Sequence, residues 1–185
     1  MSKQLRIWLF VLLSTLLTSS SLLAEGVITM TTSKAVGEKI SLAIKANGNV
    51  TIEGVGETPQ LDGQSHSYTL TSQTITIRGH VASLDCSGNQ LTGLNLTRST
   101  ALITLNCSNN QLTSLDLSKN VVLITLNCSN NQLSNLDLSE NRALKTLNCV
   151  SNQLTSLDLS NHSTLESLSC EKNQLIRLNL SGCSS

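Results

Sequence analysis

A phrase of 21 residues that recurs in unbroken register constrains this chain more than any other feature. Residues 102–122 read LITLNCSNNQLTSLDLSKNVV, and residues 123–143 read LITLNCSNNQLSNLDLSENRA. Related copies occupy 81–101, 144–164 and 165–185, so that five copies follow one another. A short repeat of this kind buries its apolar side chains only by stacking on its neighbours. The sequence therefore predicts a solenoid over the whole repeat region, residues 81 to 185.

Each copy contains two nested halves. In residues 102–122 the apolar positions follow the spacing L-x-x-L-x-C, and L-x-x-L-x-L follows ten residues later. The L-x-L parts alternate with a period of two, which is typical of a short strand with one face inward. Asn and Ser follow each half and favour bends. We expect each coil to contain a strand, a bend, an extended segment and a bend, in a mainly β fold with little or no helix.

The segment LITLNCSNNQL resembles the leucine-rich-repeat core L-x-x-L-x-L/C-x-x-N-x-L. The doubled form of 21 residues with Cys is similar to that of bacterial internalin-type surface proteins. This resemblance covers residues 81–185. It implies a curved right-handed solenoid of short parallel strands, a secreted or cell-surface location in a bacterium, and binding as the activity, without naming a ligand.

Residues 25–80 have a different pattern. Segments such as KISLAIKA and TITIRG alternate apolar and polar residues, and the turn dipeptides Asn47-Gly48 and Asp62-Gly63 separate such runs. This pattern predicts a small antiparallel β unit. We expect it to cap the first coil, because an uncapped solenoid end exposes both its core and a strand edge. An independent immunoglobulin-like module is the alternative, although about 55 residues is small for one.

The first 24 residues have the features of a secretory signal peptide. Lys3 and Arg6 form a basic start, an apolar run from Ile7 to Leu17 follows, and cleavage is expected after Ala24. The apolar run is shorter than the roughly 20 residues that a spanning helix needs. A cleaved signal is therefore favoured over a membrane anchor, and no stable membrane insertion is expected afterwards.

At the other end, the fifth copy finishes at Ser185 and no capping pattern follows it. We expect the last coil to fray, to pair with another chain, or to mark the truncation of a longer ancestor.

Composition argues against several partners. Without Lys3 and Arg6, ten basic residues face twelve acidic ones, and Tyr68 is the single aromatic residue after residue 24. Nucleic-acid binding needs a basic patch, commonly with aromatic platforms, so no nucleic-acid partner is expected. Catalysis needs a converging acid, base or nucleophile, whereas a stacked array supplies rows of one residue type. The sequence therefore predicts no enzyme.

Stacking places equivalent residues of successive coils about 4.8 Å apart, so the repeats form columns. Parallel inward cysteines do not bring their Cβ atoms to the roughly 3.8 Å of a disulfide, and a straight row cannot build a tetrahedral zinc site. A nucleophile would need an exposed thiol near a base. We interpret the cysteine column as a buried structural ladder. Its members are Cys86, Cys107, Cys128, Cys149 and Cys170.

A second column is asparagine at the bend after the first strand. Its amide can satisfy both donors and acceptors of the turning backbone, so we interpret it as another structural ladder. Its members are Asn89, Asn110, Asn131, Asn152 and Asn173. Cys183 lies outside both ladders, at a position that earlier copies fill with Asn120, Asn141 and His162. We expect it to be an exposed free thiol or a site for an intermolecular bridge.

The candidate partner-binding face is the outward side of the first strand, which by resemblance is the concave side. It is polar and nearly uncharged, so a solvated sheet face is the alternative to a platform for a protein or glycan. The residues assigned to it are Thr104, Asn106, Ser108, Thr125, Asn127, Ser129, Thr146, Asn148 and Ser169.

The second strand carries Asp116, Asp137 and Asp158 in one column. Stacked carboxylates repel unless they are solvated, hydrogen-bonded or bridged by a cation. Tight calcium binding needs six to eight converging ligands, so we favour aspartates that bond the following Ser over a weak cation site. No metal or cofactor is predicted.

These patterns together predict a non-enzymatic secreted or surface-exposed repeat protein. It would bind a protein or glycan on a cell surface, in adhesion or host interaction. The alternative is a structural or vestigial fragment of a larger repeat surface protein, with no ligand of its own.

Overall fold

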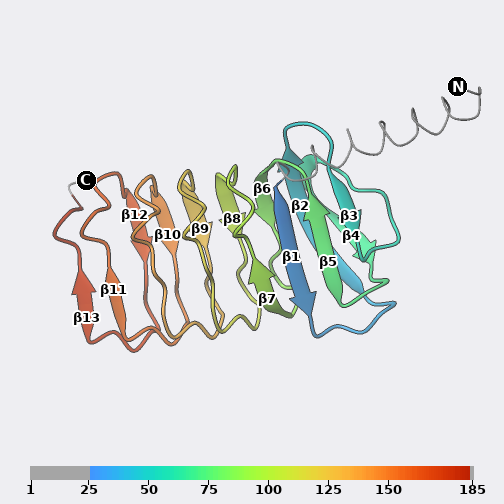
Figure 1. The fold of residues 1–185 in the computed structure, drawn as a ribbon. Coiled ribbons are helices and arrows are strands. Elements are labelled where there is room, and N and C mark those ends of the chain that lie inside the picture. Colours follow the sequence, from blue (N-terminus) through green and yellow to red (C-terminus); the bar gives the residue numbers. More distant parts are fainter. Residues whose placement is uncertain (1–25, 184–185) are drawn as a thin grey trace, which may run out of the picture.

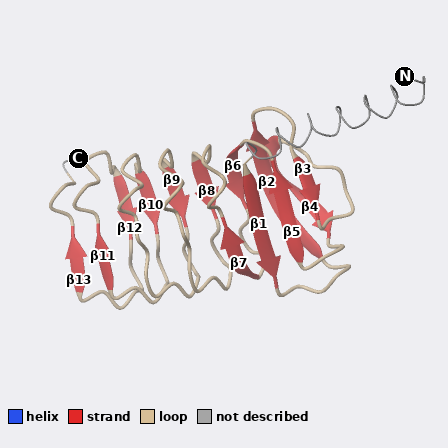
Figure 2. Ribbon diagram, in the orientation of Figure 1, coloured by secondary structure: helices blue, strands red, loops and turns tan. Residues whose placement is uncertain are grey.

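The computed structural model describes residues 26–183, and over this range the chain forms thirteen strands and no helix (Figure 2). The predicted signal peptide, residues 1–24, lies outside the described residues. The strands form one row of stacked coils with a β cap at its N-terminal end (Figure 1). The predicted mainly β fold is therefore confirmed.

The cap contains five strands joined in antiparallel pairs. Alternate residues of these strands point inward, so that side chains such as Leu42 and Ile77 are fully buried. The predicted antiparallel β cap is thus present. Its strands are β1 (Val27–Thr32), β2 (Lys39–Ala46), β3 (Thr51–Glu53), β4 (Asp62–Thr69) and β5 (Thr74–Arg78).

The first halves of the five coils form a row of parallel strands. Equivalent positions face one another, as where Thr104 pairs with Thr125 and Thr125 with Thr146. This register reproduces the spacing of the repeats, and the predicted leucine-rich-repeat solenoid is confirmed. The strands are β6 (Val81–Asp85), β8 (Thr104–Asn106), β9 (Thr125–Asn127), β10 (Thr146–Asn148) and β12 (Ser167–Ser169).

Both sheets of the cap continue into the first coil. The seven-stranded sheet has the order β12-β10-β9-β8-β6-β2-β4, in which β2 pairs antiparallel with β6. The four-stranded sheet has the order β3-β5-β1-β7, in which β1 pairs antiparallel with β7 (Leu91–Asn95). The first coil therefore has no free strand edge toward the N-terminus, because cap strands occupy it in both sheets.

The second halves of the coils pair less regularly. Besides β7, strands occur here only at β11 (Ser156–Asp158) and β13 (Arg177–Asn179) within residues 26–183, and these two pair in parallel. Asp116 and Asp137 lie in extended segments outside any strand, so their predicted place on a second strand is wrong. A surface cavity of about 330 Å³ lies between the segments that carry these two aspartates.

One continuous hydrophobic core runs from the cap through coil four and includes Leu165 at the start of coil five. Leu105 and Leu126 of coils two and three are fully buried, whereas Leu178 and Leu180 of coil five are 42% and 41% exposed. Coil five packs on coil four alone within the described residues, so part of its apolar surface stays uncovered.

In the bend after each first strand, the residue directly before the ladder asparagine has a left-handed backbone, with φ between 53° and 68°. Coil one has a second such residue, Gln90, with φ of 54°. The left-handed turn aims that asparagine into the coil. Glycine and asparagine tolerate this conformation best, and they fill three of the five positions. The five residues are Gly88, Asn109, Asn130, Ser151 and Lys172.

Candidate functional site

The strand face consists of two parallel rows of polar side chains. β8, β9 and β10 each read Thr-Leu-Asn, and their pairing aligns the threonines in one row and the asparagines in another. The central leucines are buried, so the flanking residues point away from the core. Ser169 of β12 continues the asparagine row. Six half-buried residues line the centre of the face: Thr104, Asn106, Thr125, Asn127, Thr146 and Asn148.

Ser108 and Ser129 were assigned to this face and do not belong to it. They are only 4% and 6% exposed. Each strand ends at its asparagine, so the two-residue alternation no longer holds at the serine, where the chain already bends. The Ser108 hydroxyl donates to Oδ1 of Asn106 at 2.8 Å, and Ser129 does the same to Asn127 at 2.8 Å. These serines position the asparagines of the face.

Because these asparagine oxygens are occupied, the face offers mainly amide donors and hydroxyls. Nδ2 of Asn106 donates to Oδ2 of Asp85 at 2.8 Å. Within the described part of the chain, Nδ2 of Asn127 and Nδ2 of Asn148 have no hydrogen-bond partner. The face can therefore donate hydrogen bonds to a partner, but it holds no apolar or aromatic side chain to anchor one.

The cysteine column lies in the core behind this face. All six cysteines of the described range are free thiols; Cys86, Cys107, Cys128 and Cys149 are fully buried, and Cys170 is half-buried. Burial raises the pKa of the Cys149 thiol to about 12 and that of Cys128 far above its usual value. A neutral buried thiol is a poor nucleophile and metal ligand, so the column contributes packing.

The asparagine column joins each coil to the one before it. Nδ2 of Asn110 donates to the carbonyls of Cys86 and Cys107 at 3.1 and 3.0 Å. Its Oδ1 accepts from the backbone N–H of Asn89 and Leu91 at 3.0 and 2.9 Å. One side chain thus satisfies four backbone groups of two coils, and Asn131, Asn152 and Asn173 repeat most of this pattern.

A second ladder, which the repeat pattern does not reveal, lies at the opposite bend. Asn120 and Asn141 are fully buried, and Nδ2 of Asn141 donates to the carbonyls of Leu117 and Asn120 at 3.1 and 2.9 Å. Cys183 occupies this column. It is half-buried, and its thiol donates to the Leu159 carbonyl at 3.5 Å. Cys183 is therefore a free thiol, but it is half-buried and not exposed as expected, since the column faces inward. An intermolecular bridge through Cys183 stays a prediction.

The aspartate column is solvent-exposed and bonded locally. Oδ1 of Asp116, Asp137 and Asp158 accepts from the backbone N–H of the serine two residues later, at 2.9 Å in each case. These serine N–H bonds, followed by the serine hydroxyl bonds, lower the pKa of all three carboxyls. The predicted aspartate–serine bonding is confirmed.

A surface cavity of about 300 Å³ lies between the second halves of coils three and four, and Asp137, Asp158 and His162 line it. Over residues 26–183, no three or more His, Cys, Asp or Glu side chains lie close enough to hold a metal ion. No helix of the described chain is long and apolar enough to span a membrane.

Exposed apolar side chains occur in the cap, in coil five and, next to the strand face, in two bends that the sequence-based expectations did not include. Ile103, Val121, Val122 and Ile124 lie in the bends that lead into β8 and β9 and are 36% to 49% exposed. The sequence does indicate that Ile103 and Ile124 are exposed, because the other copies carry Ala, Lys and Glu in the same column. A column that accepts charge faces solvent, so its two isoleucines are surface residues.

Stacked parallel strands with inward rows of cysteine and asparagine define the class of protein. The repeat region is an internalin-like leucine-rich-repeat solenoid.

A particular solved structure supports this class: the functional domain of InlJ from Listeria monocytogenes, which includes a cysteine ladder. It is 36% identical to this chain, with a TM-score of 0.51, and the match covers 58% of this chain. The same match covers 24% of the InlJ chain, so this protein spans only part of that length. No family model and no curated protein matches the sequence.

Proposed function

We propose that this chain is a non-enzymatic repeat protein, secreted or displayed on a bacterial surface. It binds a protein or glycan on a cell surface, in adhesion or host interaction. The observation that carries this proposal is the internalin-like solenoid, with the InlJ domain as its structural relative. The described residues supply rows of like side chains and no converging set of metal-binding groups, which favours binding over catalysis.

The binding surface in this proposal is the polar strand face. Its threonines and asparagines are aligned by the sheet register, and the amides of Asn127 and Asn148 keep free donors. A rigid, aligned row of donors loses little conformational entropy on binding, which favours recognition through hydrogen bonds. Carbonyl and hydroxyl groups of a protein or glycan are suitable acceptors.

A cell-binding assay with matched variants tests the proposal. Fluorescently labelled protein is titrated onto host and bacterial cells, and the bound amount is measured by flow cytometry. The face variant combines Thr104→Lys, Thr125→Lys and Thr146→Lys. The control variant places the same charges on exposed residues of the second halves, through Thr113→Lys, Ser134→Lys and Thr155→Lys.

We expect the face variant to bind about tenfold more weakly than the wild type, with the control variant unchanged. Treating the cells with protease or with glycosidases then distinguishes a protein partner from a glycan. Equal binding by both variants would contradict the assigned face. Absence of saturable binding to any cell type, by protein that is folded and monomeric, would contradict the binding function and favour the structural or vestigial alternative.

Export is a separate part of the proposal and rests on the N-terminal pattern. We expect protein recovered from the medium or cell surface of a secretion host to begin at Glu25 when its N-terminus is sequenced. Retention of the full chain, starting at Met1, inside the cell would contradict export.

A further inference from the structure

An exposed apolar cluster lies beside the strand face. We define the bend patch as Ile103, Val121, Val122 and Ile124, with exposed fractions of 42%, 49%, 44% and 36%. The backbone N–H of Ile124 donates to the carbonyl of Ile103 at 2.8 Å, so the two coils meet at this point. Ile103 directly precedes Thr104 of β8, and the patch is therefore continuous with the threonine row of the face.

The fold does not require apolar residues at these positions. Leu102 and Leu123 of the same bends are fully buried and supply the core contacts. In coils four and five the column of Ile124 holds Lys145 and Glu166, whose Nζ and Oε1 atoms form an ion pair at 2.8 Å. A charged pair thus satisfies the same backbone site. Neighbouring apolar side chains that lie outside the buried core are characteristic of an interaction surface.

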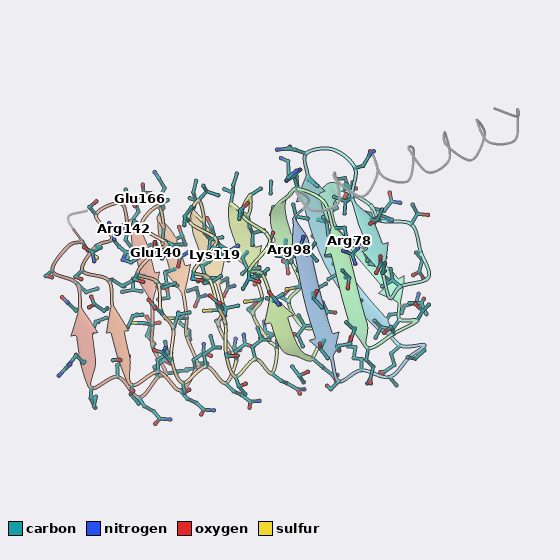
Figure 3. All side chains as sticks on the ribbon, in the orientation of Figure 1. Arg78, Arg98, Lys119, Glu140, Arg142 and Glu166 are labelled. Carbon is teal, nitrogen blue, oxygen red and sulfur yellow. The ribbon has the colours of Figure 1, made fainter. Side chains whose placement is uncertain are left out.

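The surroundings of the bend patch are basic. Arg98, Lys119 and Arg142 are exposed in the same series of bends, and Figure 3 shows them following one another along the solenoid together with Glu140. Within the described residues, none of these three cations has a carboxylate within ion-pairing distance. The chain as a whole has a formal net charge of +0, so this excess of positive charge is local.

We propose that the bend patch docks a protein segment that presents an aliphatic or aromatic side chain next to carboxylates. This inference rests on the proposed partner-binding function and extends its surface from the strand face over the adjoining edge. The apolar contact supplies the anchor that the polar face lacks. The three unpaired cations attract the acidic segment and orient it on the patch.

Selection from a displayed library of random 12-residue peptides tests this proposal on the intact protein. The most enriched peptide is synthesised, and its Kd is measured by fluorescence anisotropy for each variant. The anchor variant is Ile103→Thr with Ile124→Thr, which keeps branched side chains at Cβ and removes apolar surface. Val36→Thr is the matched control, because Val36 is 62% exposed and lies in the cap. The charge variant is Lys119→Gln with Arg142→Gln.

We expect enriched peptides to carry Asp or Glu beside a large apolar residue. The anchor variant raises the measured Kd about tenfold. The charge variant raises the Kd several-fold and reduces the dependence of the Kd on salt. The Val36→Thr variant leaves the Kd unchanged. Urea midpoints equal to that of the wild type establish that all variants remain folded.

Several results would overturn the inference. The inference is overturned if no peptide is enriched or if the enriched peptides lack acidic and apolar residues. It is also overturned if the anchor variant binds the peptide as tightly as the wild type. A wild-type dimer in sedimentation that the anchor variant abolishes would assign the patch to a second copy of the chain. Peptide binding lost only in the Thr104, Thr125 and Thr146 variant would overturn the bend patch while leaving the proposed function in place. Peptide binding at the patch without any cell binding would contradict the proposed function and leave the docking site.

Discussion

Coil one and coil five carry the same repeat pattern but differ in burial. Leu96 of coil one is fully buried, whereas Leu180, its equivalent in coil five, is 41% exposed. Coil one lies between the cap and coil two, and coil five contacts coil four alone in the described chain. The leucine pattern therefore determines which side chains point inward, while the neighbours on each side determine how much stability their burial yields.

The cap stabilises coil one because it imitates a preceding coil. Each later ladder asparagine bonds the backbone of the coil before it, as Asn110 bonds the Cys86 carbonyl and the Leu91 N–H. Asn89 has no such coil and uses Ser41 of β2. Its Nδ2 donates to the Ser41 carbonyl at 2.7 Å, and its Oδ1 accepts from the Ser41 N–H at 2.9 Å. The ladder therefore begins in the cap.

Alanine substitution of the equivalent leucines gives the largest expected contrast between the two ends. Leu96→Ala should lower the free energy of unfolding by about 3 kcal/mol, because it removes a fully buried side chain and leaves a cavity. Leu180→Ala should cost less than about 1 kcal/mol, since much of that side chain is already in water. Urea denaturation followed by circular dichroism measures both. Equal losses would mean that coil five is covered in solution, which sedimentation of the wild type would then reveal.

The ladder asparagines give a somewhat smaller contrast. Asn89→Ala should lower the free energy of unfolding by about 2 kcal/mol, because buried backbone groups of both cap and coil one lose their partners. Asn173→Ala should cost about half as much, since water reaches the half-buried groups it leaves. The same urea experiment measures both. If Asn173→Ala lowered the free energy of unfolding as much as Asn89→Ala does, water would be excluded from coil five as fully as from coil one.

The repeat pattern predicted the fold correctly because five copies in one register leave little freedom. The alternation L-x-L and the asparagine bends were enough to place the parallel strands and both inward rows of the first half. The sequence did not show that Ser108 and Ser129 are buried at the bend and do not point outward with the strand face. The residue at which a strand ends depends on where the bend begins. The sequence also did not show that the segments around Asp116 and Asp137 form no strand, because the same L-x-L spacing is a strand in coil four.

The surface was harder to predict than the core for a physical reason. Burial requires apolar residues in every copy, so core columns are uniform and easily recognised. A surface column tolerates any residue, so Ile103 and Ile124 resemble the core leucines in composition and differ from them only in the variability of their column. The inward column of Asn120 and Asn141 was missed for a related reason, because His162 and Cys183 make it look variable.

Alkaline titration distinguishes the thiols of the two ends. Burial raises the pKa of Cys86 far above the usual thiol value of about 8.5, so this thiol ionises mainly in the unfolded chain. The stability that the buried neutral Cys86 thiol contributes is fully present below about pH 8.5. It is lost as pH rises toward the folded-state pKa, because the free energy of unfolding then falls by about 1.4 kcal/mol per pH unit. Urea midpoints of Cys86→Ala should therefore fall less between pH 8 and pH 10 than those of the wild type. Cys170→Ala, at the half-buried thiol, should change that slope less.

An identical slope in the wild type and Cys86→Ala would contradict the burial of the cysteine ladder. Comparison of slopes, rather than of stability at a single pH, separates ionisation from the packing lost with the sulfur atom. Other groups that titrate in this range contribute equally to both proteins.

The left-handed bend residues give the smallest contrast. Gly88 of coil one has φ of 68°, and a Cβ added there would meet nothing within 4 Å, so Gly88→Ala tests backbone conformation alone. It should lower the free energy of unfolding by about 1 kcal/mol.

Lys172 of coil five has φ of 53° and bears the same strain in the native chain, so Lys172→Gly relieves it. Because coil five can open before the rest unfolds, the gain should reach only a few tenths of a kcal/mol globally. Hydrogen exchange of the coil-five amides should slow more clearly than the urea midpoint rises, and a large rise in midpoint would show that coil five unfolds together with coil one.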